Sequence, residues 1–195
     1  MAVDRLTADD RLMLFSDERW PQDIGALAIL DGAPLLDPDG RFRIEAARDA
    51  VECRLHLLPR FRQVLYQPRR GLGLPLWVDS ADFDIRSHVG VVELPAPVNE
   101  ARLLAAVQDL RAHRLSRNRP LWEMWFLPGL SESRVGLFIR LHHVIGDGIA
   151  GVATLGSLLD VAPDMAPPPG PAWTPQPRPT DGELLRDNLR RRADR

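Results

Sequence analysis

The chain has 195 residues, which fits one domain of ordinary size with an appendage. Its content of 45% hydrophobic and 27% charged residues is typical of a soluble folded domain and argues against a disordered or collagen-like chain. The formal net charge of -2 offers no overall attraction to a polyanion, so nucleic acid is not an expected partner.

The chain contains one cysteine, Cys53, which excludes an intrachain disulfide and a cysteine-built metal cluster. The first residues, MAVDRLTADDRL, lack the zones of a signal peptide, and no apolar stretch approaches the roughly 20 residues that cross a bilayer. We therefore expect a cytoplasmic protein whose membrane contact, if any, is peripheral. All basic residues are arginine, which removes lysine chemistry such as Schiff-base formation.

The first half of the chain alternates helix and strand signals. Thr7 is followed by two aspartates, which predicts a helix start because a hydroxyl can accept a backbone N–H and acids favour the positive end of the helix dipole. The run IGALAILDG then predicts a strand that closes in a turn. Apolar residues recur three and four apart from Ile44 to Leu58, which predicts a helix that Pro59 ends. The segments FRQVLY, LPLWVD and HVGVVELP have the β-branched and aromatic content of strands.

The second half contains the clearest helix and two further strands. The predicted helix runs from Asn99 to His113, begins with a capping asparagine and presents one apolar face, formed by Leu103, Leu104, Val107 and Leu110. The runs LWEMWFL and RVGLFIRLHH predict strands, and the pattern of the first predicts that both of its faces are largely covered. A further helix is expected from Gly148 to Asp160. This order of elements predicts an α/β fold, a two-layer sandwich of mixed β-sheet and helices.

The composition changes near residue 163. Eight of the 18 prolines lie from Pro163 to Pro179, which predicts an extended linker. The TDGE pattern that begins at Thr180 predicts the capped start of an amphipathic helix. We therefore divide the chain into an N-terminal domain at 1–162, a proline-rich linker at 163–180, and, at 181–195, the start of a helix that leads towards a C-terminal domain.

The segment LHHVIGDG, from Leu141 to Gly148, carries the strongest chemical signal, because an apolar strand there gives way to a glycine-rich turn and a helix. Neighbouring strand residues point to opposite faces, so we do not expect His142 and His143 to ligate one ion, and we expect no metal site. A histidine with an ordinary pKa of about 6.5 can instead take a proton from a hydroxyl at neutral pH. Asp147 can turn back to orient the local structure, while the glycines allow a sharp turn or the close approach of a substrate.

Together with three other segments, this motif resembles the bacterial wax ester synthase/diacylglycerol acyltransferase family. A His-His pair by itself also fits simple packing with satisfied hydrogen bonds. The family belongs to a group of CoA-dependent acyltransferases with chloramphenicol acetyltransferase-like enzymes and peptide-synthetase condensation domains, whose hallmark HHxxxDG stands here as HHVIGDG at His142 to Gly148. The other segments are DRLTADDRLMLFSDE at Asp4 to Glu18, FRQVLYQPRRGLGLPLWVDSADFDIRSHV at Phe61 to Val89, and PLWEMWFLPGL at Pro120 to Leu130.

The resemblance implies one half of a chloramphenicol acetyltransferase-like fold and a role for each residue of the motif. His143 would be the general base, and His142 a positioning residue. Asp147 would pair with an arginine and hold the loop, and Gly148 would let the next helix start close to the site. Family members continue into a second domain, with the active-site tunnel between the two halves, so catalysis would need a C-terminal half.

The implied function is an O-acyltransferase that moves a long-chain acyl group from acyl-CoA to diacylglycerol or a fatty alcohol, in triacylglycerol or wax ester synthesis. His143 would take the hydroxyl proton, acyl-CoA would be a co-substrate, and no bound cofactor is expected. Direct transfer is favoured because Cys53 has no basic motif beside it and no serine stands in a nucleophile elbow. An exposed apolar face would meet the C-terminal half or a second copy, and contact with the inner membrane or lipid droplets would be peripheral.

Two other functional interpretations stay open. One is a condensation-type or other CoA acyltransferase with a different acceptor, and the other is a non-catalytic half-domain that binds lipid or a partner chain. Smaller features also have two interpretations. The aromatic residues Trp122, Trp125 and Phe126 can pack in the core or line an acyl channel, and Arg69 and Arg70 can be solvated or meet CoA phosphates. We favour the structural interpretation of each.

Overall fold

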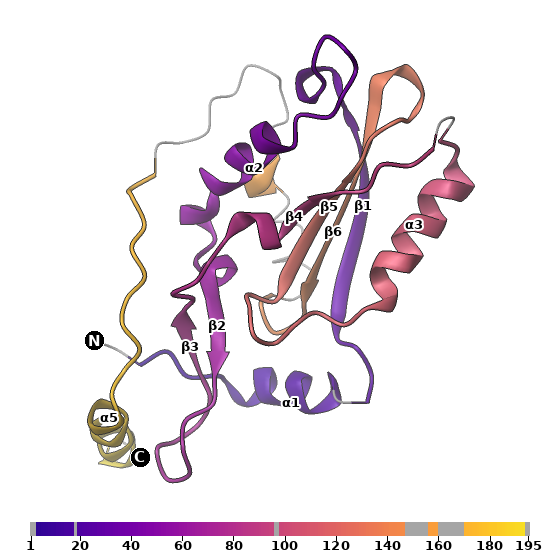
Figure 1. Cartoon of the computed structure of the whole chain (residues 1–195). Helices are drawn as coiled ribbons and strands as arrows, with labels where there is room; N and C mark the ends of the chain where they lie inside the picture. Colours follow the sequence, from indigo (N-terminus) through magenta and orange to yellow (C-terminus); the bar gives the residue numbers. More distant parts are fainter. Residues whose placement is uncertain (1–2, 18, 96–97, 147–155, 160–169, 194–195) are drawn as a thin grey trace.

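A four-stranded mixed sheet lies at the centre of the molecule (Figure 1). The computed structural model describes residues 3–17, 19–95, 98–146, 156–159 and 170–193. The strands stand in the order β1 (Asp23–Asp31), β6 (Arg134–His142), β5 (Trp122–Leu127) and β4 (Val89–Val91). β6 is antiparallel to both of its neighbours, whereas β4 runs parallel to β5. The predicted α/β fold with a mixed sheet is therefore confirmed.

Helices pack on both faces of this sheet, because β6 contributes buried apolar side chains to each face. Its odd-numbered residues pack in one cluster with α2 (Ile44–Glu52), whereas Phe138 packs in a second cluster with α3 (Glu100–Ala112). Figure 1 shows α2 and α3 on opposite sides of the strands, so helices cover both faces of the sheet, whereas the sequence predicted a two-layer sandwich. A Cβ atom at Gly136 would lie 2.9 Å from a methyl carbon of Leu103. The glycine therefore lets α3 approach the strand closely.

The aromatic residues of β5 pack in the core. The even-numbered residues of the strand belong to the cluster on the α2 side, and Trp125 and Leu127 to the cluster on the α3 side. Trp122 is fully buried, and its indole Nε1 donates to the carbonyl oxygen of Phe61 over 2.8 Å. Both faces of β5 are covered as predicted, and the structural interpretation of its aromatic residues is confirmed.

The predicted end of the second helix is wrong. The helix that was expected to reach Leu58 ends at Glu52, and two 3-10 turns follow, η2 (Leu55–Leu57) and η3 (Pro59–Arg62). The backbone hydrogen bonds there join residues three apart. A proline disfavours the helical conformation of the residue before it, and tight 3-10 turns bury Leu55 and Phe61 without continuing the helix.

Helix α3 begins as predicted but presents a narrower apolar face. The side chain of Asn99 accepts the amide of Arg102 over 2.9 Å, which caps the helix. Leu103 and Val107 are buried against the sheet, whereas Leu104 is 45% exposed. Successive residues of an α-helix are about 100° apart around its axis, so Leu104 points away from the sheet that Leu103 and Val107 face. The helix expected from 148 to 160 lies mostly outside the described residues.

A hairpin and the first helix lie beside one end of the sheet. β2 (Gln63–Tyr66) pairs antiparallel with β3 (Leu76–Asp79), and α1 (Ala8–Asp17) runs below the sheet in Figure 1. The hydroxyl of Thr7 accepts the amide of Asp10 over 3.1 Å, which confirms the predicted helix start. The remaining short helical turns are η1 (Ala33–Leu35), η4 (Ile85–Ser87) and η5 (Ser131–Ser133).

The C-terminal segment ends in a helix with the predicted capping box. Residues 170–180 form no helix or strand, and α5 (Asp181–Ala193) follows them. The Glu183 carboxylate accepts the amide of Thr180 over 2.8 Å, while the Thr180 hydroxyl accepts the amide of Glu183 over 3.3 Å. Each residue therefore satisfies a backbone amide at the other end of the first turn.

Helix α5 is held against the N-terminal residues and the β2–β3 hairpin (Figure 1). Leu184 is fully buried in a cluster with Val3 and Leu76. Beside this cluster, Nε of Arg5 donates to the carboxylate of Asp187 over 2.7 Å. The helix therefore has a docked position on the described part of the chain, while the domain boundaries proposed above stay a prediction.

Replacing Leu184 by alanine should release α5. Truncation of a buried leucine costs about 2–5 kcal/mol, and Leu184 is the buried residue of this helix. We expect faster amide hydrogen exchange throughout α5 with unchanged protection of β5 and β6. Leu185→Ala is the matched control, because Leu185 is 49% exposed on the same helix. Equal protection of α5 in both variants would contradict the docking role of Leu184.

Candidate active site

The end of β6 places its two histidines in different surroundings. Phe138, Arg140 and His142 share the face towards α3, because alternate residues of a strand share a face. His143 follows the last residue of the strand, and its amide donates to the carbonyl oxygen of Gln22 over 2.7 Å. His142 is 3% exposed, whereas His143 is half-buried. The two rings therefore meet different chemical environments.

Both ring nitrogens of His142 face polar groups. Nδ1 accepts the amide of Val144 over 3.1 Å, so the neutral ring carries its proton on Nε2. Nε2 lies 3.4 Å from Oδ1 of Asp17, within ion-pair distance but without the alignment of a hydrogen bond. Burial lowers the pKa of the imidazole, and the attraction of Asp17 opposes this shift without cancelling it. His142 is therefore neutral at neutral pH.

Asp17, the last residue of α1, was not singled out by sequence reasoning. Its Oδ1 accepts the amide of Gln22 over 2.9 Å, and its Oδ2 accepts from Arg117 over 2.7 Å. Burial raises the pKa of this carboxyl, but the hydrogen bonds from Arg117 and from the Gln22 amide outweigh burial and hold the pKa below its usual value. An ionised carboxylate thus lies beside the motif. The only available signal was its position inside the DRLTADDRLMLFSDE segment.

In the turn after β6, the backbone of His143 is hydrogen-bonded, whereas its ring is not bonded to the described residues. The neighbouring Val144 is buried, and the amides of both residues are bonded. Within the described part of the chain, the ring of His143 forms no hydrogen bond. Asp147 and Gly148 lie outside the described residues, so the prediction that they share this junction stays a prediction.

Acidification below about pH 6.5 should lower the free energy of unfolding. Burial lowers the pKa of His88 and of His142, so the unfolded chain takes up these protons at a higher pH than the folded chain. Above the pKa of these histidines in the unfolded chain, their contribution to the free energy of unfolding is complete. This contribution is lost as the pH falls towards their lower pKa in the folded chain. The charged groups that face His142 are Asp17, Arg117 and Asp23.

Denaturant titrations at about pH 7.5 and about pH 5.5 measure this loss. The double variant His88→Gln/His142→Gln should show a smaller difference between the two pH values, because neither replacement titrates in this range. Equal stability of the unchanged chain at both pH values would show that these histidines do not oppose folding when they are protonated.

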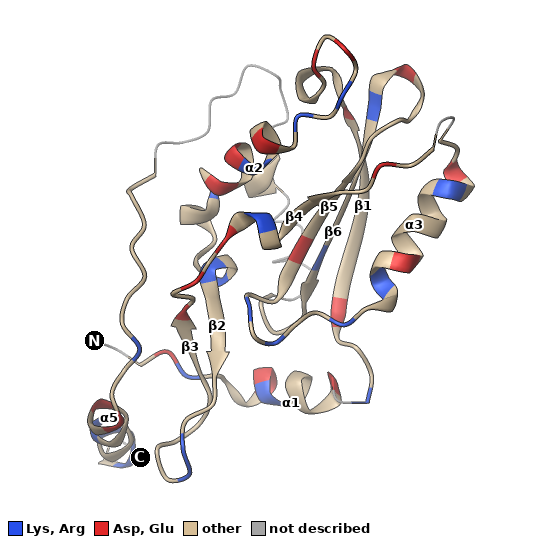
Figure 2. Ribbon diagram, viewed as in Figure 1, with Lys and Arg blue, Asp and Glu red and all other residues tan. Residues whose placement is uncertain are grey.

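A buried ion pair on the face of His142 was also missed by sequence reasoning. Arg140 and Glu123 stand opposite each other on β6 and β5, and the guanidinium donates to the carboxylate over 2.8 Å from Nη2 and 3.2 Å from Nε. The two residues are 2% and 5% exposed. Arg119 also pairs with Glu123. Figure 2 shows acidic and basic segments within the sheet strands. In the sequence, the available signal for this pair was a charged residue inside each of two apolar runs, Glu123 in LWEMWFL and Arg140 in RVGLFIRLHH.

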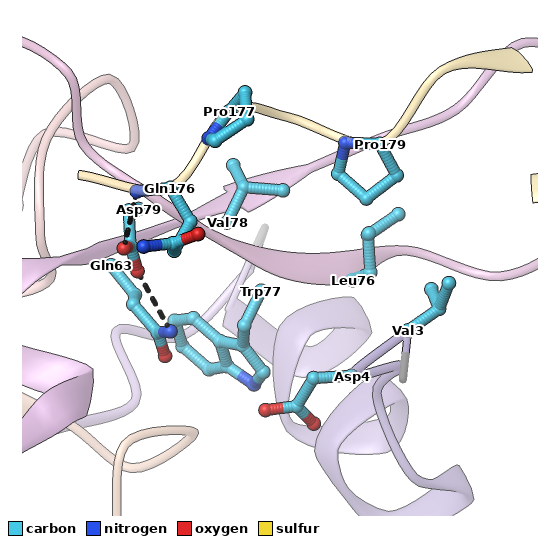
Figure 3. Close-up of a pocket in the computed structure, with 10 residues that line it drawn as sticks. All are labelled: Val3, Asp4, Gln63, Leu76, Trp77, Val78, Asp79, Gln176, Pro177 and Pro179. Carbon is cyan, nitrogen blue, oxygen red and sulfur yellow. Dashed lines mark hydrogen bonds between the residues drawn. The ribbon is translucent and has the colours of Figure 1, made fainter. Parts of the chain in front are cut away.

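Two pockets lie under the segment 170–179. The first, of about 140 Å³, is shown in Figure 3, where the Asp79 carboxylate accepts from the Gln176 amide over 2.9 Å and from Gln63 Nε2 over 3.1 Å. The second, of about 340 Å³, is lined in part by Trp173 and by Arg62, whose guanidinium lies 5.0 Å from the centre of the indole ring. Neither pocket is lined by a histidine of the motif. We therefore assign no reaction to them.

The arginines between β2 and β3 lie on the surface. The side chain of Arg69 is 86% exposed and stands 3.9 Å from Asp181, and Arg70 is exposed as well. This placement fits the solvated interpretation, because such an exposed ion pair contributes little to stability or binding.

Comparisons with known proteins agree with the sequence resemblance. The model of the wax ester synthase/diacylglycerol acyltransferase catalytic domain matches residues 6–194. A Mycobacterium tuberculosis protein named as a diacylglycerol O-acyltransferase is 38% identical over 182 residues, which are 93% of this chain and 38% of that protein. A second protein of that organism, named as the diacylglycerol O-acyltransferase tgs1, is 42% identical over 70% of this chain and 28% of its own length. The chain thus spans less than half of these relatives.

Solved structures show the same fold. The wax ester synthase/diacylglycerol acyltransferase from Marinobacter aquaeolei VT8 has a TM-score of 0.66 and 28% identity over 85% of this chain and 41% of that one. A starter condensation domain of the rhizomide synthetase RzmA has a TM-score of 0.62 at 14% identity, over 81% of this chain and 36% of that one, which shows a shared fold alone. Because the family match covers nearly every residue, this chain belongs to the wax ester synthase/diacylglycerol acyltransferase family.

Proposed function

We propose that this chain supplies the general base of an acyl-CoA-dependent O-acyltransferase whose acceptor is diacylglycerol or a long-chain alcohol. The observation that carries the proposal is the difference between the two histidines. The ring of His142 is buried between Val144 and Asp17, whereas His143 is a half-buried residue whose ring makes no hydrogen bond to the described residues. Membership of the family, and the names of the relatives, support these substrate classes.

The proposed reaction is a direct transfer. The imidazole of His143 takes the proton of the acceptor hydroxyl while the oxygen attacks the thioester carbonyl carbon of acyl-CoA. The tetrahedral intermediate collapses with cleavage of the carbon–sulfur bond, and the CoA thiolate recovers the proton from the imidazolium. The products are an ester and free CoA, and the histidine returns to its neutral form.

A covalent acyl-enzyme on cysteine is not supported by the structure. Cys53 is exposed just after α2, and its thiol donates to the carbonyl oxygen of Ala50 over 3.2 Å. A nucleophilic thiol needs a base or another activating group within hydrogen-bond reach. Among the described residues, the groups bonded to the Cys53 thiol are the Ala50 carbonyl and the guanidinium of Arg54, and the nearby imidazole of His56 bonds to the Cys53 backbone carbonyl rather than to the thiol.

We further propose that the reaction needs a second half and that this half covers apolar surface around α1. α1 has no buried residue, and Leu12, Phe15 and the following Trp20 are 61%, 70% and 75% exposed. Large exposed apolar patches often mark contact sites, and 182 matched residues make up only 38% of the Mycobacterium tuberculosis relative reported above. The same surface could instead meet the inner membrane or a lipid droplet. No helix among the described residues is long and apolar enough to span a bilayer.

Acyl transfer from a long-chain acyl-CoA to diacylglycerol, a fatty alcohol and an amine tests the proposed function. We expect ester products when the chain is combined with the C-terminal half of a longer relative, and little product from the chain alone. Amide formation as the main reaction would favour a condensation-type enzyme. Lipid binding without any product would favour a non-catalytic half-domain. Full activity of the monodisperse chain alone would contradict the need for a second half.

A further inference from the structure

Two series of polar contacts connect the backbone amides of His143 and Val144 to the carboxylate of Asp17. In the first series, the backbone amide of His143 donates to the backbone carbonyl of Gln22 over 2.7 Å, and the backbone amide of Gln22 donates to Asp17 over 2.9 Å. In the second series, the amide of Val144 donates to Nδ1 of His142 over 3.1 Å, and Nε2 of the same ring faces Asp17 over 3.4 Å. One side chain from α1 therefore constrains the chain on both sides of His143.

Only a carboxylate fits this position, because the polar groups around it are donors. The backbone amide of Gln22 and the Arg117 guanidinium donate to the two oxygens of Asp17, and Nε2 of His142, which carries the ring proton, lies 3.4 Å from Oδ1. By favouring the proton on Nε2, the carboxylate leaves the lone pair of Nδ1 for the amide of Val144. An asparagine would turn an NH₂ group towards one of these donors, and two facing donors repel each other.

The carboxylate of Asp17 is mostly buried and lies close to two arginines. Its side chain is 13% exposed, and Arg117 and Arg114 approach it at 2.7 and 3.9 Å. Arg114 also donates to the backbone carbonyl of Asp17. The end of α1 is thus bonded to the segment that precedes β5, so contacts outside β6 also hold Asp17 in place.

We propose that Asp17 is a positioning residue for acyl transfer, which sets the backbone of His143 through Gln22 on one side and His142 on the other. The proposal rests on the proposed function of His143 as the base. Asp17 acts through these two residues and does not touch the substrate. A base displaced by about 1 Å can lose as much as 10²-fold in rate, which is the effect expected when the carboxylate is lost.

Asp17→Asn in the 195-residue chain tests the geometry directly. We expect the amides of His143 and Val144 to exchange about tenfold faster, the size of one lost hydrogen bond, with unchanged exchange in β5. Nitrogen-15 spectra should show that His142 loses its uniform Nε2-protonated form. Asp17→Glu, which retains a carboxylate, should restore that form in part, and Asp9→Asn, on the exposed side of the same helix, should change neither signal. Unchanged exchange and an unchanged tautomer in Asp17→Asn would overturn the proposal.

Kinetics separate this proposal from the proposed function. In the chain combined with the C-terminal half of a relative, Asp17→Asn should lower kcat by about 10- to 100-fold with little change in the KM for acyl-CoA. Asp17→Glu should recover part of the loss, whereas a purely structural defect would lower the amount of folded protein and leave kcat per folded molecule unchanged. If His143→Ala is inactive but Asp17→Asn has a normal kcat, the positioning role of Asp17 is wrong while the proposed function of His143 stands. If His143→Ala is fully active, the proposed base itself is wrong.

Discussion

Replacing His143 by alanine should lower turnover by about 10²- to 10⁴-fold in the chain combined with a C-terminal half, because a positioned general base contributes a factor of this size. His143 is half-buried and its ring makes no hydrogen bond to the described residues, so loss of the ring should leave the fold intact. The measurement is ester formation from long-chain acyl-CoA, with thermal unfolding as the check on folding.

Two further variants make this result specific. His142→Ala should lower stability, because it leaves the buried amide of Val144 without an acceptor, and should reduce turnover less than His143→Ala. His113→Ala replaces an exposed histidine after α3 and should leave turnover unchanged. Normal turnover in His143→Ala would rule out the proposed mechanism, and a complete loss in His142→Ala alone would assign the base to the other ring.

Replacing Glu123 by alanine should lower the free energy of unfolding by about 3–5 kcal/mol, the usual cost of removing one partner of a buried ion pair. Arg140 is 2% exposed and would keep its charge without the carboxylate that accepts two of its hydrogen bonds. The Asp23 carboxylate lies 3.9 Å from Nη1 of Arg140, at the edge of ion-pair distance, and the backbone carbonyl of His113 accepts a further bond, so neither replaces the close contact with Glu123. Denaturant titration at neutral pH measures the loss.

The matched control is the exposed pair of Asp39 and Arg41, whose side chains are 75% and 81% exposed and 3.8 Å apart. Asp39→Ala should cost less than about 1 kcal/mol, because solvent screens such a pair. The double variant Glu123→Leu/Arg140→Met removes both buried charges and should be more stable than Glu123→Ala. If Glu123→Ala lowers the free energy of unfolding as little as Asp39→Ala does, the buried charge of Arg140 does not need Glu123 as its partner.

Short patterns along the chain determined most of the local structure. The alternation in β5, the cap at Asn99 and the capping box at Thr180 each depend on residues within one strand or one helical turn, so neighbouring side chains suffice to predict them. Short segments of the sequence also predicted the family, which the comparisons confirm. The early end of α2 escaped prediction because packing of Leu55 and Phe61 decides it.

The tertiary structure alone decided how the candidate site is built. Asp17 and His142 are far apart in the sequence, and they meet because α1 ends beside the last residue of β6. Glu123 and Arg140 pair because the register of β5 on β6 sets them opposite each other in the interior. The sequence determined which residue types stand near the strand end, but strand register and burial determined that His142 is engaged and that His143 keeps its ring free of bonds to the described residues. Such contacts depend on the whole fold, because no local pattern encodes the distance between residues that only folding brings together.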